Sequence, residues 1–481
     1  MEESPPRESG ASEETETRAQ ESKESKSVRQ SLRVVFSWRN YSVYLFTVWV
    51  YSGFTVIYEF FNLYLRKLGW DFVLIGVVVS VILAISAIAR FVGGYIGDVT
   101  DRKKLSVVAM FMLATNHLIL GIFTDFIFIL GALIIYASMD LAKGGSTAYI
   151  MENIPKEHSG LALSLFQSGR SWGILTLTAF GLMMPVVGFP EGLRLLYLIS
   201  GLLLLASTVA RAALLSPSPQ KGRAKDKPLW RDFISENKQA VKLILSFMPG
   251  VLAIVVLDGI SDSIWRYGAL IYTNEILRID VGGINIMVLI PLIVSLPLLL
   301  KVGRLSDTRG IKRATLLVYS VMPICAGLLI VAPAFPIWAP QSVIVAADSL
   351  IDGLGVVFTT PFLAIVAKLI NDSLWALVLI TLIQKSMPRT DTAKVLGVFW
   401  TIVYIVSSIG PFFGGLIYQF MNPSTMFAVV MVTNLLILLG IARYRFEREN
   451  PDTLTGRIDA LESRIQKLRR EIEDFRTQRK L

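Results

Sequence analysis

The sequence predicts an all-α integral membrane protein of two six-helix bundles, with about twelve transmembrane helices related by a pseudo-twofold repeat. Three observations predict this fold: an apolar composition, a series of long apolar runs, and a motif that occurs once in each half. Of the 481 residues, 53% are hydrophobic and only 17% are charged, and the mean hydropathy is +0.58. Soluble domains carry a larger charged fraction, so the chain is expected to cross a bilayer repeatedly.

The net charge of +10 comes from Lys and Arg residues placed mainly in short turns between apolar runs. This placement follows the positive-inside rule, so we expect no nucleic-acid partner, a multi-pass protein of the cell membrane, and both termini in the cytoplasm. One cysteine, Cys325, and two histidines, His117 and His158, are too few for a disulfide framework or a zinc site. We therefore expect no metal, no cofactor and no enzymatic activity.

A glycine-rich helix end followed by an acidic residue and a basic cluster occurs twice in the chain. The first copy runs from Gly93 to Lys104 and the second from Gly303 to Arg313. Each copy lies between two long apolar runs, so each predicts a short cytoplasmic turn between two membrane helices. Because the motif repeats after about half the chain, it predicts two similar bundles.

This arrangement resembles the major facilitator superfamily, whose signature turn lies between helices two and three and recurs between eight and nine. The resemblance covers about residues 40 to 445, and it implies that the turns form a conformational latch outside the substrate site. Val99, Asp101 and Thr308 depart from the family pattern. The family commonly has an arginine near the position of Arg90, so Arg90 is assigned to the latch. The matching latch residues are Gly94, Asp98, Arg102 and Lys103 in the first copy and Gly303, Asp307, Gly310, Lys312 and Arg313 in the second.

The apolar runs and the charged segments between them predict five parts. The polar N-terminal tail cannot bury enough apolar surface to offset its ordering entropy, so we expect it to be disordered. An outer insertion at Ile337 to Phe358, expected as a short surface helix, precedes a tenth span at about Thr360 to Lys385. The predicted parts are a tail (1–38), a first bundle (39–215), a cytoplasmic linker (216–240), a second bundle (241–445) and a heptad-repeat helix (446–481).

Seven of the charged residues inside the spans are candidates for a functional role, because charge there is costly and usually faces a bundle interior or water. In the resembled fold, helices one, four, seven and ten line a central cavity, and most of the seven fall on these helices. This coincidence predicts a substrate and proton pathway. Its residues are Glu59 in span one, Asp140 and Lys143 in span four, Arg170 in span five, and Asp258, Asp262 and Arg266 on one face of span seven.

Structural explanations stand beside this functional one. Asp140 and Lys143, at i and i+3, can neutralise each other, and Asp262 and Arg266 can pair along their helix, which leaves Asp258 without a local partner. Arg170 needs a partner from another element, with Asp140, Glu59 or an anionic substrate group as candidates.

Three further polar residues carry open alternatives. His117 is either a buried hydrogen-bond partner or a proton relay. Lys368 and Asp372, at i and i+4 in the tenth span, are expected to pair or to reach the membrane surface.

The C-terminal segment has apolar residues at alternating spacings of four and three. This heptad pattern predicts a parallel two-stranded coiled coil, and hence a homodimer through residues 454–475. The alternative is an amphipathic helix that lies on anionic lipid or docks on the bundle. The seam residues are Leu454, Ile458, Leu461, Ile465, Leu468, Ile472 and Phe475.

Together these patterns predict a secondary transporter that moves a small solute by alternating access, coupled to protons taken up on Glu59, Asp258, Asp262 or Asp140. No phosphate-binding loop of the Gly-x-x-x-x-Gly-Lys-Ser/Thr type occurs, which argues against ATP as the driving force. Two alternatives remain open. One is a facilitator without proton coupling, and the other is a non-transporting sensor or scaffold that acts through the C-terminal coil.

Overall fold

The computed structural model of the chain is almost entirely helical. No strand occurs among the described residues, whose one β-bridge joins Ile337 and Thr359. The all-α prediction is confirmed. The described residues are 32–152, 162, 165–166, 168–217, 230–309, 311–350, 353–386 and 392–443.

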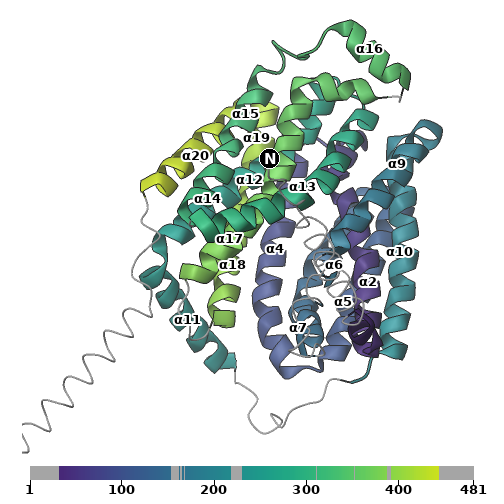
Figure 1. Ribbon diagram of the computed structural model, residues 1–481. Helices are drawn as coiled ribbons and strands as arrows, with labels where there is room; N and C mark the ends of the chain where they lie inside the picture. Colours follow the sequence, from purple (N-terminus) through teal and green to yellow (C-terminus); the bar gives the residue numbers. More distant parts are fainter. Residues whose placement is uncertain are drawn as a thin grey trace, which may run out of the picture.

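The first bundle contains spans that are interrupted rather than continuous (Figure 1). Its first span changes from α-helix to 3-10 helix and back, its fourth breaks at Met139, and its fifth opens with a 3-10 turn. Its elements are α2 (Arg39–Phe54), η1 (Thr55–Phe60), α3 (Phe61–Lys67), α4 (Phe72–Val99), α5 (Arg102–Ile122), α6 (Phe126–Ser138), α7 (Asp140–Glu152), η3 (Ser168–Trp172), α9 (Gly173–Val187) and α10 (Phe189–Leu214).

The second bundle follows a helix that runs across its end. This helix, α11 (Trp230–Phe247), meets the next one at 98° and therefore does not continue it as one straight span. The bundle itself consists of α12 (Pro249–Glu275), α13 (Val281–Arg309), α14 (Ile311–Tyr319), α15 (Val321–Val331), α17 (Thr360–Ser386), α18 (Thr392–Ser407), α19 (Ile409–Phe420) and α20 (Ser424–Arg443).

The number of candidate crossings agrees with the predicted layout. Among the described residues, ten helices are long and apolar enough to cross a membrane. Helix α12 passes the same test together with α11, and the shorter apolar helix Val281–Ser295 lies within α13. Counted together, these match twelve crossings in two bundles.

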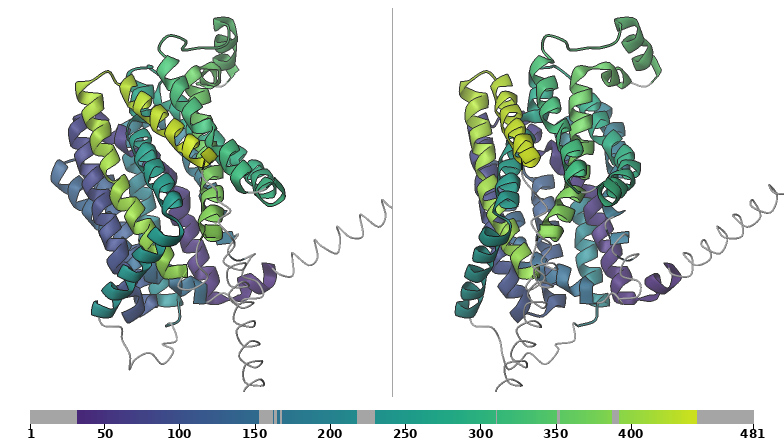
Figure 2. Two further views of the ribbon diagram at one scale, coloured as in Figure 1. Left: turned by 90° about the vertical axis from the view of Figure 1, so that its left-hand side faces the viewer. Right: turned by 60° about the vertical axis from the view of Figure 1, so that its left-hand side comes forward.

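An insertion lies between α15 and α17, beyond the ends of the spanning helices (Figures 1 and 2). It contains α16 (Gln341–Leu350) and η4 (Leu354–Phe358). Backbone hydrogen bonds join its two ends, from Trp338 N to Phe358 O (3.1 Å) and from Thr360 N to Pro336 O (3.0 Å). The structure therefore has a short helix where the sequence predicts an outer insertion.

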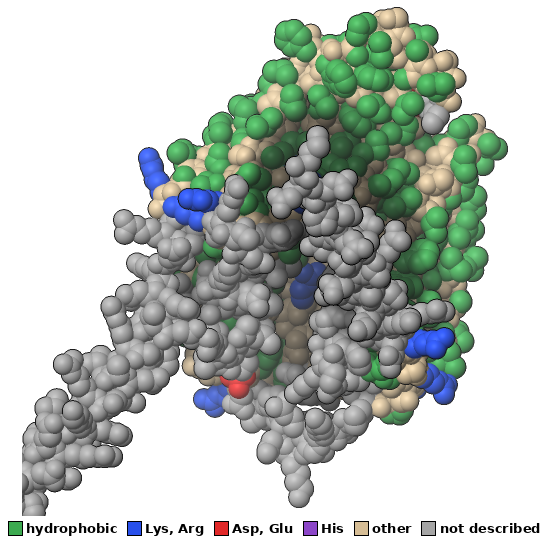
Figure 3. All heavy atoms as spheres, viewed as in Figure 1, with side chains coloured by type: hydrophobic (Ala, Val, Ile, Leu, Met, Phe, Trp, Pro, Cys, Tyr) green, Lys and Arg blue, Asp and Glu red, His purple; other side chains and the backbone are tan. Residues whose placement is uncertain are grey.

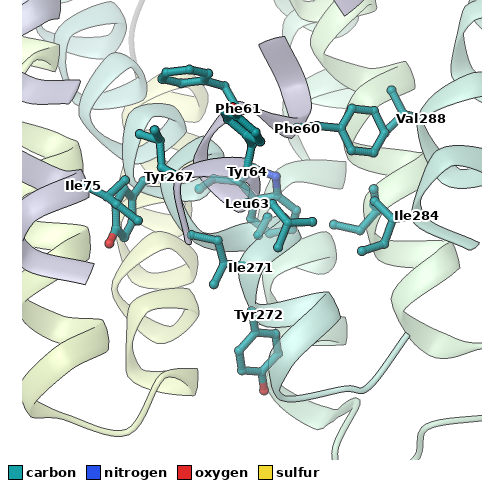
Figure 4. Close-up of a cluster of buried hydrophobic side chains, with 14 of the residues drawn as sticks. Phe60, Phe61, Leu63, Tyr64, Ile75, Tyr267, Ile271, Tyr272, Ile284 and Val288 are labelled. Carbon is teal, nitrogen blue, oxygen red and sulfur yellow. The ribbon is translucent and has the colours of Figure 1, made fainter. Parts of the chain in front are cut away.

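The fully buried apolar core joins the two bundles in one half of the molecule, and in the other half Phe91 of α4 packs on the core of the second bundle. We call the end of the bundles that carries Arg102–Lys104 and Lys312–Arg313 the basic side. In the half remote from it, one cluster combines side chains of both bundles, among them Phe60 and Tyr64 with Tyr267, Ile271 and Val288 (Figure 4). Nearer the basic side the buried core separates into one cluster in the second bundle and two in the first.

Helix α4 is the main contact between the bundles, packing on both α18 and α19. Two glycines permit this approach. A Cβ at Gly76 would lie 2.5 Å from Pro411 O, and one at Gly415 would lie 2.6 Å from Phe72 O. The two helices therefore touch backbone to backbone, a contact that any side chain at these positions would prevent.

Candidate functional site

A cavity of about 510 Å³ lies along the inner face of the first bundle and reaches the second at one residue, Arg266. Figure 3 shows a hollow between the bundles with a basic side chain inside it. Of the seven predicted pathway residues, Glu59, Lys143, Arg170 and Arg266 line the cavity. The complete lining is Tyr44, Val48, Tyr51, Ser52, Thr55, Val56, Glu59, Ala109, Met110, Leu113, Met139, Lys143, Ser146, Phe166, Arg170, Arg211 and Arg266.

Two 3-10 segments present opposite charges to this cavity. Glu59 lies in η1, Arg170 lies in η3, and Arg170 Nη2 is 3.7 Å from Glu59 Oε1. Glycine makes the approach of η3 to the first span possible, because a Cβ at Gly169 would lie 2.9 Å from Ser52 Cβ and one at Gly173 would lie 2.4 Å from Val56 Cγ1. Glu59 is thus one of the partners predicted for Arg170.

Glu59 also contacts the second bundle. Its Oε1 lies 3.6 Å from Arg266 Nη1, while Arg266 donates from Nε to Asp262 Oδ2 (2.7 Å) and lies 3.4 Å from Asp372 through Nη2. Both arginine contacts of Glu59 are longer than a direct hydrogen bond. The carboxylate is therefore shared between the bundles without being fixed to either.

Behind Arg266 lies Lys368, for which the sequence analysis left two alternatives open. The Lys368 side chain is 2% exposed, and its Nζ donates to Asp262 Oδ1 (2.7 Å) and contacts Asp372. Pairing with Asp372 agrees with the prediction, but the alternative in which Lys368 reaches the membrane surface is wrong. Asp262 consequently has two cationic partners, whereas the sequence identified Arg266 alone.

A second cluster of charged side chains is centred on Asp140, at the break between α6 and α7. The buried carboxylate accepts from Arg90 Nη2 (3.0 Å) and lies 3.9 Å from Lys143 Nζ, which confirms the predicted proximity of Asp140 and Lys143. The Arg90 guanidinium also lies 4.3 Å from the ring centre of Tyr404 on α18, across the bundle boundary. Of these residues, only Lys143 lines the cavity.

Asp258 is buried outside the cavity wall, and its partners come from other helices rather than from its own. It accepts hydrogen bonds from Tyr319 OH (2.9 Å) and from Trp375 Nε1 (2.7 Å). These donors come from α14 and α17, so a search for partners along its own helix cannot find them.

Arg211 is a cavity residue that the sequence analysis missed. Its side chain is 2% exposed; Nε donates to Thr47 Oγ1 (2.9 Å), Nη1 donates to Ser106 Oγ (3.0 Å), and the guanidinium lies 4.2 Å from the Tyr44 ring centre. No carboxylate of the described residues lies within ion-pair distance of it. The sequence gives no signal for this role, because an arginine near a helix end commonly reaches the lipid headgroups.

His117 lies outside the cavity lining. It is fully buried, its Nδ1 lies 2.9 Å from Leu113 O one turn earlier, and its ring packs against Tyr58 and Tyr197. These contacts favour the hydrogen-bond-partner alternative. In the part of the chain that the structure describes, no group of three or more metal-ligating side chains occurs, and Cys325 is a free buried thiol.

The latch residues are described only in part. Asp101, a departure from the family pattern, accepts from Lys103 N (2.9 Å) and so caps α5, while Gly94 approaches the Phe233 ring of α11. Gly310 and the side chains of Asp98 and Asp307 lie outside the described residues. The latch therefore stays a prediction.

The comparisons with known proteins identify the family. The Major Facilitator Superfamily profile matches residues 3–177 and 41–374. The chain belongs to the major facilitator superfamily. It is accordingly a multi-pass membrane transporter, and the resemblance predicted from its two turns is confirmed.

The alignments with solved structures of the same fold cover nearly all of each solved chain and most of this one. The nucleoside transporter NupG matches with a TM-score of 0.62 at 12% identity, covering 85% of this chain and 99% of that one. A D-xylose-proton symporter gives 0.58 at 13% identity, with coverage of 87% and 99%. The human organic anion transporter MFSD10 gives 0.55 at 14% identity, with coverage of 84% and 99%. No curated protein matches the chain.

Proposed function

We propose that the chain is a proton-coupled secondary transporter that carries a small solute through the cavity by alternating access. The observation that carries this proposal is the uneven contact between the bundles. In the half remote from the basic side, Arg66 Nε donates to Glu275 Oε1 (2.8 Å), Tyr267 OH donates to Phe72 O (2.5 Å) and Phe412 N donates to Ser80 Oγ (2.9 Å). The apolar cluster that spans both bundles adds to this closure.

The exposure of the cavity side chains supports a transport cycle with two end states. The cavity side chains of Lys143, Arg170 and Arg266 are about half exposed although they lie between spanning helices. Water therefore reaches the cavity while the remote half is closed. Opening the remote contacts and closing the basic side would turn the cavity toward the other face.

Glu59 is the proton carrier in this proposal. It is the one carboxylate in the cavity lining, and cations face it from both bundles, Arg170 from η3 and Arg266 from α12. Protonation would remove the negative charge that attracts both guanidinium groups, so proton uptake would weaken a contact between the bundles. A proton whose binding changes the balance between two conformations is coupled to them. Asp140, Asp258 and Asp262 lie behind the cavity wall and remain the alternative carriers.

The positions of the basic turns support a cytoplasmic assignment for the basic side, since Lys and Arg accumulate in cytoplasmic loops. We propose residence in the cell membrane with both termini on that side. The predicted coiled coil at 454–475 lies outside the described residues, and the homodimer stays a prediction.

Flux measurements with the full-length protein in proteoliposomes test the proposed function. The vesicles enclose a pH-sensitive dye and receive small carboxylates, nucleosides or pentoses from outside, with protein-free vesicles as the control. We expect uptake of at least one solute together with a change of internal pH. Uptake that is independent of a pH gradient would indicate a facilitator, and a complete lack of flux would favour a sensor or scaffold.

A further inference from the structure

The cavity lining carries an excess of positive charge. Four of its residues are cations, Lys143, Arg170, Arg211 and Arg266, and one is a carboxylate, Glu59. Carboxylates behind the cavity wall compensate part of this excess. Asp140 forms an ion pair with Lys143, and both Asp262 and Asp372 form ion pairs with Arg266.

Two arginines are left with incomplete compensation. Among the described residues, Arg211 has hydroxyl, carbonyl and aromatic partners but no carboxylate, and Arg170 has only a long contact to Glu59, a carboxylate that it shares with Arg266. The Arg211 guanidinium is buried, and a guanidinium kept away from bulk water without a counterion is costly, whereas Arg170 is half exposed and can reach an anion in the cavity. The first bundle therefore holds a positive potential that an anion in the cavity would stabilise.

Arg211 lies beside two aromatic rings of the cavity lining. Phe166, a turn before Arg170, stacks on Tyr44 (6.4 Å between ring centres), and Tyr44 lies under the Arg211 guanidinium. Ser146, one turn after Lys143 on α7, accepts from Tyr44 OH and lies 3.5 Å from Arg211 Nη1. Arg211 therefore lies at the Tyr44 ring, while Arg170 lines the same cavity beside Glu59.

The remaining lining is largely apolar. Its side chains would contact a hydrocarbon or aromatic body, while the hydroxyl groups of Ser52 and Thr55 add polar contacts. A cavity of about 510 Å³ lies in the size range of small-molecule sites, which combine apolar walls with a few placed polar groups. The apolar lining residues are Val48, Val56, Ala109, Met110, Leu113 and Met139.

We propose that the cavity binds a small organic anion, with an acidic head group at Arg170, in a positive potential to which Arg211 contributes, and an apolar body against α2, α5 and Met139. Arg170, whose side chain is 58% exposed, is the direct donor to the head group. Arg211, held by Thr47 and Ser106, supplies fixed positive charge at the wall. A guanidinium fork matches carboxylate and phosphate geometry, so both head groups belong to this class.

This inference names the substrate class of the proposed transporter and rests on that function. Its test uses the purified full-length protein in detergent at low chloride, with benzoate, benzamide and benzamidine as probes. The three probes share one ring and a planar substituent but differ in charge. Hexanoate with hexanamide repeats the comparison on an aliphatic body, and phenyl phosphate separates phosphate from carboxylate head groups.

We expect a carboxylate or the phosphate to raise the unfolding temperature in a saturable way, and benzamide, hexanamide and benzamidine to leave it unchanged. Arg170→Gln should weaken anion binding about tenfold or more, because it removes a charge-assisted donor. Arg194→Gln is the matched control, since Arg194 lies outside the cavity and donates to Ile122 O. Arg211→Lys keeps the charge while removing the fork geometry, and should retain part of the affinity.

Several results would overturn the proposal: equal or better stabilisation by a neutral or cationic probe, no stabilisation by any anion, or unchanged anion binding by the Arg170→Gln protein. The proposed function fails separately. Anion binding in detergent without flux in vesicles would contradict transport and leave the anion site intact. Flux of neutral solutes without anion binding would contradict the anion site and leave the transport function intact.

Discussion

The Glu59 carboxylate lies between two arginines of different bundles, 3.7 Å from Arg170 Nη2 in the first and 3.6 Å from Arg266 Nη1 in the second. Neither contact is a direct hydrogen bond, so small movements of either bundle can exchange one for the other. Arg266 continues the connection to Asp262 and Asp372, and through them to Lys368. Charges of alternating sign thus link η3 of the first bundle to α17 of the second.

The ion pair between Arg66 and Glu275 closes the remote half, and its loss should favour opening there. Both side chains are about a quarter exposed, so the pair stabilises closure by roughly 0–1 kcal/mol, at most about a fivefold change in the balance of states. The measurement is labelling of Ile271→Cys by an impermeant maleimide in a Cys325→Ser background. Glu275→Gln should accelerate labelling and Glu191→Gln, in the first turn of α10, should not. Slower labelling in the Glu275→Gln protein would contradict the assigned role.

Asp262→Asn should destabilise the protein chiefly by stranding Lys368. That ammonium group is 2% exposed and would retain Asp372 as its only carboxylate among the described residues. Breaking a buried pair costs about 3 kcal/mol, which should appear as a clearly lower unfolding temperature. Asp125→Asn is the control, because Asp125 precedes α6 without a side-chain capping bond. An unchanged unfolding temperature for Asp262→Asn would show that the buried lysine does not depend on this carboxylate.

Gly76→Ala should separate α4 from α19, because its Cβ would lie 2.5 Å from Pro411 O and a backbone atom cannot rotate away. We expect a loss of about 1–3 kcal/mol, typical of overpacking, and reduced flux. Gly440→Ala is the matched control, since a Cβ there meets nothing within 4 Å and alanine favours the helix. Equal unfolding temperatures for the two variants would rule out the close approach of α4 and α19.

The sequence predicted the fold because its two signals are local. Apolar run length fixes which segments can span, and the repeated turn at Gly94 to Lys103 and Gly303 to Arg313 relates the halves. The insertion before Thr360 was also predictable. The segment from Ala314 to Pro388 is longer than its counterpart from Leu105 to Pro155, and basic residues at both of its ends require an even number of crossings.

The candidate site was predictable only where charge lies well inside a span, as for Glu59, Arg170 and Arg266. Partners on other helices leave no trace in local spacing, so Tyr319 and Trp375 could not be assigned to Asp258, nor Lys368 to Asp262. Arg211 was missed for a further reason. Its position near a helix end resembles that of a headgroup anchor, and its burial depends on how α10 packs against three other helices.

The most direct test of the account compares Glu59→Gln with Asp258→Asn in proteoliposomes, using a solute that the flux assay has identified. Each variant is measured for accumulation driven by a pH gradient and for exchange of labelled solute without a gradient. The account predicts that Glu59→Gln loses accumulation and keeps exchange, because the amide cannot take up the coupling proton, while Asp258→Asn, outside the cavity wall, retains both. Normal accumulation by the Glu59→Gln protein, with loss in Asp258→Asn, would contradict the central claim and move the proton to the buried aspartate.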